Sequence, residues 1–378
     1  MMKTLVRAIQ VVLGLVFVFS GFVKAVDPVG GGLKVGEYLT AFFPWGETGD
    51  LFPLILGGIL CTVEFILGGG LLLGIYVPTA SLGALLFMVV MTPMTLYLAL
   101  FNPVSDCGCF GDAVHLTNWQ TLGKNVLLLG MAVIFFLRAK IAGYRWRWRK
   151  EQLPVAVTLG VGLVVFMEWN YSHLPMIDFR PFKVGADIRT LTLVPKDADV
   201  DVYAYSFIYS KEGEEKRFGL EDAPLKDSSW RFVDAEATLI KEGERPLVTG
   251  FVLYDEDGKD VTEDVLSDTA RLYLVVMPSV EKADDKYAET INALFDYAES
   301  HSYAFYGLTA SSESAILTWR DRTGGDYPFL TADATILRTI IRANPGIVLI
   351  CDGKITGKWH LGDLAEKFTF EAVNVFKK

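Results

Sequence analysis

Apolar residues form long runs in the first 170 positions of the chain, whereas apolar and polar positions are mixed after residue 171. The stretch 65–105 contains no charged side chain, which is enough for two membrane helices of roughly 20 residues each. The sequence Tyr76-Val77-Pro78-Thr79 predicts the break between them. Five spans are predicted in all: the run 51–75 contains the part of this stretch before the break, the part after the break is the next span, and further apolar runs lie at 5–26, 121–137 and 153–169. The first run also resembles a signal peptide, but no clear small-x-small cleavage site follows it, so a membrane span is predicted there.

Charge divides the chain in the same way. Residues 1–170 carry 11 basic and 9 acidic side chains, and residues 171–378 carry 24 and 36. The acidic second half would repel phosphate backbones, so nucleic acid is not expected as a partner. Six basic residues lie in the segment 138–150, whereas the loops 27–50 and 105–117 are acidic. The positive-inside rule then predicts a multi-pass protein of the bacterial inner membrane, with a cytoplasmic N-terminus and a periplasmic C-terminal domain.

Two of the four cysteines lie in one acidic loop, Ser105-Asp106-Cys107-Gly108-Cys109-Phe110-Gly111-Asp112. The loop follows a predicted span, and the predicted topology puts it on the side of the membrane that permits disulfides. A disulfide across Cys-Gly-Cys closes a small ring, and strained bridges are easily reduced. Asp106 and Asp112 disfavour the thiolate that must attack, whereas His115 is a candidate base. A static disulfide and half of a metal site are the alternatives, but the spacing to His115 is weak for zinc and no metal is predicted.

Further motifs accompany this loop: Phe19-Ser20-Gly21-Phe22-Val23-Lys24, Asp27-Pro28, Glu64-Phe65-Ile66-Leu67-Gly68 and Leu71-Leu72-Leu73-Gly74. With them, residues 1–140 resemble the DoxX and MauE-like family of small redox-associated membrane proteins. The sequence Cys107-Gly108-Cys109-Phe110-Gly111 resembles the cysteine motif of the MauE-type branch. The resemblance implies a four-helix bundle and a role in handling thiols or disulfides outside the membrane.

Glu64 is the only charged residue between Asp50 and Asp106, and it lies well inside the second predicted span. A carboxylate at such a depth is costly and marks a functional site by default. It is either a proton partner for thiol or quinone chemistry or a polar clamp between helices. Cys61 lies one turn earlier on the same helical face, where it is either a further redox residue or a small core residue.

The second half of the chain has the patterns of an exported α/β protein. Residues 200–209 and 231–240 read as strands within a β-rich segment over 171–247. From residue 248 a hairpin at 251–259, a buried strand at 271–277 and a helix at 286–301 follow. A strand at 304–308, a helix at 332–344 and two strands at 347–351 and 355–359 complete the order. This order and the run Asn344-Pro345-Gly346-Ile347-Val348-Leu349-Ile350-Cys351 resemble a thioredoxin-like domain over 248–378, in which Pro345 matches the cis-proline beside the peptide-binding groove.

One departure from that fold family matters for function. The redox cysteines should follow the strand that ends at Met277, but Pro278-Ser279-Val280-Glu281 contains none. Without a Cys-x-x-Cys motif the domain is expected to hold a partner beside Pro345 rather than to catalyse exchange itself. Cys351 is read as a buried strand residue, with a reactive thiol as the alternative.

The predicted fold class is a membrane all-α helical bundle, with a four-helix core at 1–140 and a basic cytoplasmic loop and fifth span at 141–170, followed by an α/β thioredoxin-like extracytoplasmic domain. The predicted function is membrane-linked thiol–disulfide exchange, with extracytoplasmic protein thiols and the lipid bilayer as partners and quinone as a candidate cofactor. Cys107, Cys109, Glu64 and His115 are the catalytic candidates, and Pro345 is the candidate partner-binding residue. The alternative is a non-catalytic scaffold whose degenerate thioredoxin-like domain binds envelope proteins.

Overall fold

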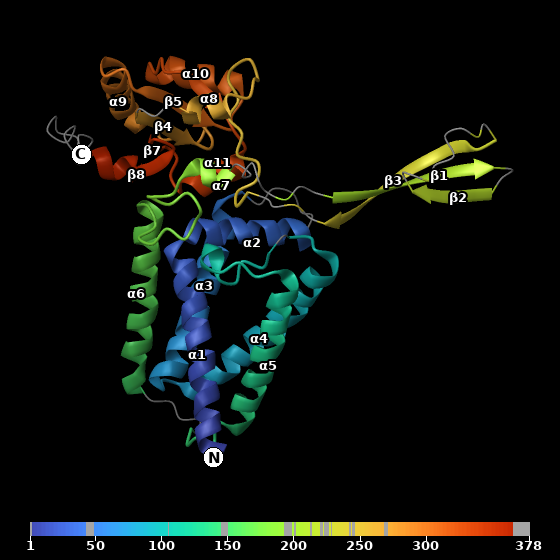
Figure 1. Cartoon of the computed structure of the whole chain (residues 1–378). Helices are drawn as coiled ribbons and strands as arrows, with labels where there is room; N and C mark the ends of the chain where they lie inside the picture. Colours follow the sequence, from blue (N-terminus) through green and yellow to red (C-terminus); the bar gives the residue numbers. More distant parts are fainter. Residues whose placement is uncertain are drawn as a thin grey trace.

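The computed structural model of the chain consists of a helical bundle, a domain stacked on one end of it and a projecting three-stranded sheet (Figure 1). The structure describes residues 2–42, 49–104, 106–144, 150–192, 199, 202–211, 214–219, 222, 227, 229–241, 243, 246–267 and 271–365. Here, the end of the bundle on which the C-terminal domain sits is called the domain-bearing end.

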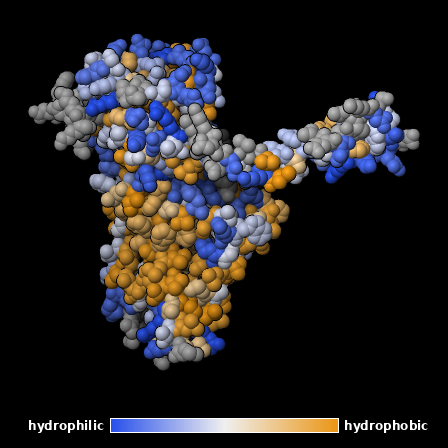
Figure 2. Space-filling model, in the orientation of Figure 1, coloured by the Kyte–Doolittle hydropathy of each residue, from blue (hydrophilic) through white to orange (hydrophobic). Residues whose placement is uncertain are grey.

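Within the residues that the structure describes, five helices are long and apolar enough to cross a membrane: α1 (Met2–Val26), α3 (Leu51–Leu73), α4 (Val77–Phe101), α5 (Asn118–Arg138) and α6 (Leu153–Ser172). They agree with the predicted spans, and Figure 2 shows their apolar side chains as a broad band below the C-terminal domain. Helices α1 and α3 approach closely because glycine lines their contact: a Cβ atom at Gly68 would lie 2.5 Å from the backbone nitrogen of Val18. The protein is therefore a multi-pass membrane protein.

A further helix, α2 (Pro28–Phe42), lies across the domain-bearing end of the bundle, beneath the C-terminal domain (Figure 1). The sequence predicted a loop here. The loop from Asn102 to Thr117 also lies at this end, and it contains the short 3-10 helix η1 (Gly111–Ala113). A capping box then starts α5, since the Thr117 side chain accepts a hydrogen bond from the backbone N–H of Gln120, and the Gln120 side chain accepts one from that of Thr117.

The C-terminal domain has one five-stranded sheet in the order β6-β5-β4-β7-β8. Its strands are β4 (Arg271–Met277), β5 (Ala304–Thr309), β6 (Phe329–Thr331), β7 (Gly346–Cys351) and β8 (Lys354–His360). Strand β4 is parallel to β5 and antiparallel to β7, and the Asn344–Pro345 peptide bond is cis. The βαβ unit, the antiparallel pair and the cis-proline before β7 confirm the predicted thioredoxin-like fold.

Helices cover both faces of this sheet. Alternate residues of β4 pack on α8 (Thr262–Ser267) and α11 (Ala334–Ile340) on one face, and on α9 (Ala288–Ser300) and α10 (Glu313–Thr323) on the other. The domain also includes residues before the predicted boundary at 248. Phe182 and Ile188, the latter in α7 (Ile188–Thr192), belong to its core, and the backbone N–H of Ile188 donates to the carbonyl oxygen of Gly353.

The remaining strands form a separate antiparallel sheet, which projects from the body of the molecule at the right of Figure 1. Its strands are β1 (Val202–Lys211), β2 (Glu214–Gly219) and β3 (Arg231–Lys241), in the order β2-β1-β3. Two of them match the strands predicted at 200–209 and 231–240. The sheet lies between two segments that both pack into the C-terminal domain, so it is an insertion in that domain.

Candidate functional site

The two cysteines of the loop lie side by side at the domain-bearing end of the bundle. Both are free thiols, and the Sγ atoms of Cys107 and Cys109 are 2.8 Å apart. Closing a disulfide of roughly 2.05 Å therefore needs only a small movement. Gly108 between them has a φ of +61°, a conformation that favours glycine. The hydroxyl of Tyr38, on α2, donates to the carbonyl oxygen of Cys107 at 2.5 Å and holds the loop from one side.

A polar network of Ser20, Lys24 and Glu64 holds Cys109 from the other side. Lys24 on α1 donates to both carboxylate oxygens of Glu64 on α3, at 2.7 and 2.8 Å. The Ser20 Oγ atom lies 2.8 Å from Glu64 Oε2 and 2.7 Å from the carbonyl oxygen of Cys109, with a single proton to share between them. Glu64, which is only 4% exposed, thus joins two helices to the cysteine loop. These hydrogen bonds agree with the interpretation of Glu64 as a polar clamp between helices, whereas its role as a proton partner stays a prediction.

The two thiols differ in acidity. The hydrogen bond from Cys107 lowers the pKa of Cys109 from 9.0 to about 6, with the cations of Lys124 and Lys24 acting in the same direction against burial. The same hydrogen bond, together with burial, raises the pKa of Cys107. Since the thiolate is the attacking species, the lower pKa makes Cys109 the thiol of the pair that is better suited to attack at neutral pH.

The charges around the pair differ from those that the sequence suggested. Asp106 and Asp112 were expected to oppose thiolate formation, but each has a cation beside it. The ammonium of Lys34 lies 3.4 Å from Asp106, and the guanidinium of Arg342 lies 3.6 Å from Asp112. Lys124 on α5 lies 4.3 Å from the ring centroid of Phe110, next to Cys109. Lys24 and Lys124 were not predicted as site residues, although a charged residue at the end of or inside an apolar span is the signal that identified Glu64.

Cys109 and Phe110 line a first pocket between α1, α4 and α5, here called the helix pocket. It has about 350 Å³ of empty space, which includes its open mouth. Its polar lining, Ser20, Glu64, Lys124 and Asn125, lies toward the domain-bearing end of the helices. Its apolar lining lies further along them, toward the middle of the spans, and consists of Val16, Phe17, Phe87, Met88, Met91 and Leu128.

The same two residues also line a second pocket, within the loop itself, here called the loop pocket. Its other lining residues are Asp106, Gly108, Gly111, Val114, His115, Leu116 and Thr121. His115 is exposed, and within the described part of the chain no hydrogen bond joins it to either thiol. Cys109 therefore borders one pocket among the membrane helices and another at the loop surface.

The other predicted residues lie apart from the pair. Cys61 donates to the carbonyl oxygen of Gly21 at 3.0 Å and is buried between α1 and α3. Cys351 is the last residue of β7 and is half-buried rather than buried as predicted, and the Thr356 hydroxyl donates to its Sγ atom at 3.6 Å. Pro345 is buried at the end of the domain that faces the bundle. Among the described residues, no group of three or more His, Cys, Asp or Glu side chains is arranged to hold a metal ion.

Comparisons with known proteins find matches to parts of the chain. The model of the family "Methylamine utilisation protein MauE" matches residues 2–138, and a domain of unknown function, DUF8463, matches residues 203–242. A solved structure with similarity is the solution structure of a candidate protein disulfide isomerase from Bacteroides thetaiotaomicron, at 20% identity and a TM-score of 0.28. It covers 34% of this chain and 87% of its own. No curated protein matches the chain.

Residues 2–138 are thus similar to the MauE family, and the matched segment ends at the last residue of α5. The chain joins this region to a thioredoxin-like domain, which its strand order and cis-proline define. No match of its own supports the DoxX part of the resemblance, which stays a prediction.

Proposed function

We propose that the protein performs membrane-linked thiol–disulfide exchange, in which Cys107 and Cys109 cycle between a dithiol and a disulfide. The observation that carries the proposal is the position of Cys109, a thiol of lowered pKa that borders both the helix pocket and the loop pocket. A thiol of a soluble partner would reach it through the loop pocket. A lipid-soluble electron carrier would reach it through the helix pocket. The predicted topology makes the partner an extracytoplasmic protein.

The lining of the helix pocket favours a quinone as the lipid-soluble carrier. A quinone has a flat ring with two carbonyl oxygens and a long apolar tail. Lys124 supplies a cation and Asn125 an amide beside Cys109, and Phe110 and Phe87 supply aromatic surface for the ring. The apolar residues toward the middle of the spans, such as Met88, suit the tail. Because the volume counts the open mouth, the ring would lie in the mouth of the pocket rather than be enclosed.

The chemistry balances without a further co-reactant. In the oxidising direction the Cys109 thiolate and the Cys107 thiol form one S–S bond and lose two electrons and the remaining proton. The quinone takes up the two electrons, this proton and a second proton from solvent, which replaces the one that Cys109 released there on ionising, and it becomes a hydroquinone. Lys24, Glu64 and Ser20 form a hydrogen-bonded group that reaches the carbonyl oxygen of Cys109. Glu64, which also lines the helix pocket, is the proposed proton partner for a quinone bound there. Exchange with a partner's disulfide or dithiol regenerates the starting pair.

A non-catalytic scaffold is the second candidate, because the thioredoxin-like domain contains no Cys-x-x-Cys motif. The two functions differ in what removal of the thiols does. Under the scaffold reading, a Cys107→Ser/Cys109→Ser variant keeps its binding partners and its cellular phenotype. Under the exchange reading, it keeps the fold and loses the activity.

The helix pocket provides a direct test. In lipid nanodiscs, with Cys61 and Cys351 replaced by serine, a short-chain quinone should oxidise the reduced pair, and one quinone should be consumed for every two thiols lost. Met88→Trp fills the pocket, since Met88 is 3% exposed, whereas Leu86→Trp on the same helix lies on a 56% exposed position and serves as the control.

Met88→Trp should slow oxidation by quinone at least tenfold and leave oxidation by a soluble thiol oxidant unchanged, while Leu86→Trp changes neither. Equal quinone rates in the two tryptophan variants would refute the quinone route. A pair that neither oxidant can oxidise would refute the exchange function.

A further inference from the structure

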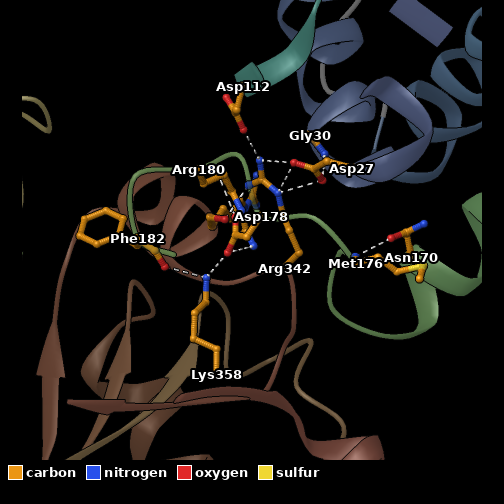
Figure 3. Close-up of polar contacts among 11 residues, drawn as sticks. Asp27, Gly30, Asp112, Asn170, Met176, Asp178, Arg180, Phe182, Arg342 and Lys358 are labelled. Carbon is orange, nitrogen blue, oxygen red and sulfur yellow. Dashed lines mark hydrogen bonds and ion pairs between the residues drawn. The ribbon is translucent and has the colours of Figure 1, made fainter. Parts of the chain in front are cut away.

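A buried arginine of the C-terminal domain, Arg342, forms an ion pair with the membrane bundle. The Nε atom of Arg342 donates to both carboxylate oxygens of Asp27, at 3.1 and 2.9 Å, and its Nη2 atom lies 2.8 Å from the same carboxylate. Nη2 also lies 3.6 Å from Asp112 in the cysteine loop (Figure 3). The Arg342 side chain is only 8% exposed. It therefore bridges the α1–α2 junction and the loop from a domain more than 200 residues away in sequence.

Arg342 belongs to a larger buried ion cluster (Figure 3). Asp178 and Arg180, which follow α6, pair at 2.7 Å, and Lys358 of β8 donates to Asp178 at 2.6 Å. With Asp27 and Asp112, three anions face three cations contributed by five segments of the chain. Buried charges are tolerated when paired in this way, and removing one partner of such a pair is strongly destabilising. The cluster therefore fixes how the C-terminal domain sits on the bundle.

The contact uses the end of the thioredoxin-like domain where its redox motif would be. Arg342 lies three residues before cis-Pro345, and the Asn344 side chain donates to the carbonyl oxygen of Ser279, in the segment that lacks the cysteines. Lys282, a few residues further on, pairs with Asp50 at the start of α3 at 2.5 Å. The predicted partner-binding end beside Pro345 thus faces the protein's own bundle.

Asp112, which Arg342 contacts, belongs to the same turn as the cysteine motif. Asp112 lies in η1, and two backbone hydrogen bonds close this turn onto the motif: Gly111 N–H to the Gly108 oxygen and Ala113 N–H to the Phe110 oxygen. Asp112 and Cys109 are therefore parts of one short turn. A shift of Asp112 toward or away from Arg342 would move Cys109 relative to Cys107.

We propose that Arg342 is a positioning residue for the dithiol: through Asp112, the thioredoxin-like domain holds the Cys107–Cys109 loop in the geometry that closes a disulfide. The end of the domain beside Pro345 takes the bundle of its own chain as its partner, and thiols of other proteins enter through the loop pocket. The inference rests on the proposed function, because the positioning matters only if the pair exchanges thiols and disulfides. Its test measures the redox equilibrium of the pair and does not require that activity.

The test is the redox equilibrium of the pair in a buffer of reduced and oxidised dithiothreitol, read by alkylation gel shift in the full chain lacking Cys61 and Cys351. Arg342→Gln should lower the ratio of disulfide to dithiol about tenfold, which corresponds to about 30 mV for a two-electron couple. A looser loop lowers the effective concentration of one thiol at the other, so the disulfide becomes less stable. Arg342→Lys, which keeps the charge, should restore most of the ratio.

Two further variants make the result specific. Lys282→Gln breaks an ion pair at the same interface that does not touch the loop, and it should leave the ratio unchanged. Asp112→Asn keeps Arg342 paired with Asp27 and should lower the ratio as Arg342→Gln does, with no further fall in the double variant. If Arg342→Gln does not fold, Asp112→Asn alone makes the measurement.

An unchanged ratio in the folded Arg342→Gln or Asp112→Asn protein would overturn the positioning role. A pair in the unsubstituted protein that never responds to the buffer would instead refute the proposed function.

Discussion

The hydrogen bond between the two thiols carries a prediction that follows directly from the site. Replacing Cys107 with alanine removes the donor that contributes most to the low pKa of Cys109, while the cations of Lys124 and Lys24 stay in place. The pKa of Cys109 should then rise from about 6 to above about 7. At pH 7 the thiolate fraction would fall from about nine-tenths to about one-half or less, and at pH 6 from about one-half to about one-tenth or less.

The assay is the rate of alkylation of Cys109 by iodoacetamide between pH 5 and 9, with Cys61 and Cys351 replaced by serine. The matched control is Cys107→Ser, which keeps a hydroxyl donor at the same position and should keep much of the lowered pKa. If the alanine and serine variants titrate at the same pH as each other and as the parent, the Cys107 hydrogen bond does not activate Cys109. The assignment of Cys109 as the nucleophile would then lose its physical basis.

Two further predictions concern the ion cluster and the topology. Burial and the neighbouring Arg180 lower the pKa of Lys358 from 10.5 to about 8. Between these two pH values the unfolded chain therefore binds more protons than the folded chain. The free energy of unfolding should then rise with pH from about 8 to 10, relative to that of the Lys358→Met variant. Thermal unfolding of both proteins at several pH values tests this, and parallel curves would contradict it. For the topology, a membrane-impermeant maleimide added to intact cells should label a cysteine placed at Ser312 and should not label one placed at Arg147. The reverse labelling pattern would contradict the predicted orientation.

The secondary structure of the chain is well predicted where a single periodicity dominates. The spans follow from the charge-free stretch 65–105 and from neighbouring apolar runs, and the buried strand at Arg271–Met277 follows from its unbroken apolar run. The helix predicted at 332–344 ends at Ile340, because the chain turns extended before Asn344 and its cis-proline. Helix α2 was missed because Gly30-Gly31-Gly32 and its mixed polar positions favour a loop in isolation. Packing against α3 stabilises the helix there.

Only part of the candidate site could be predicted from the sequence. The Cys-Gly-Cys motif and Glu64 could be predicted as site residues from their residue types and from their positions next to and inside predicted membrane spans. Lys24 and Lys124 matter only because α1 and α5 bring them to the same loop, a fact that no local pattern contains. Arg342 and Asp27 lie 315 positions apart and meet only because the C-terminal domain sits on the bundle. Long-range pairing of this kind follows from the tertiary arrangement and not from periodicity.

The measurement that tests the central claim most directly is the redox state of Cys107 and Cys109 in native membranes. Alkylation gel shift on a chain lacking Cys61 and Cys351 should show a pair that becomes reduced with a mild reductant and reoxidises when the reductant is removed. Reoxidation should depend on quinone in the membrane. A pair that stays in one state under every condition in which the protein remains folded would contradict the exchange function and leave the scaffold in its place.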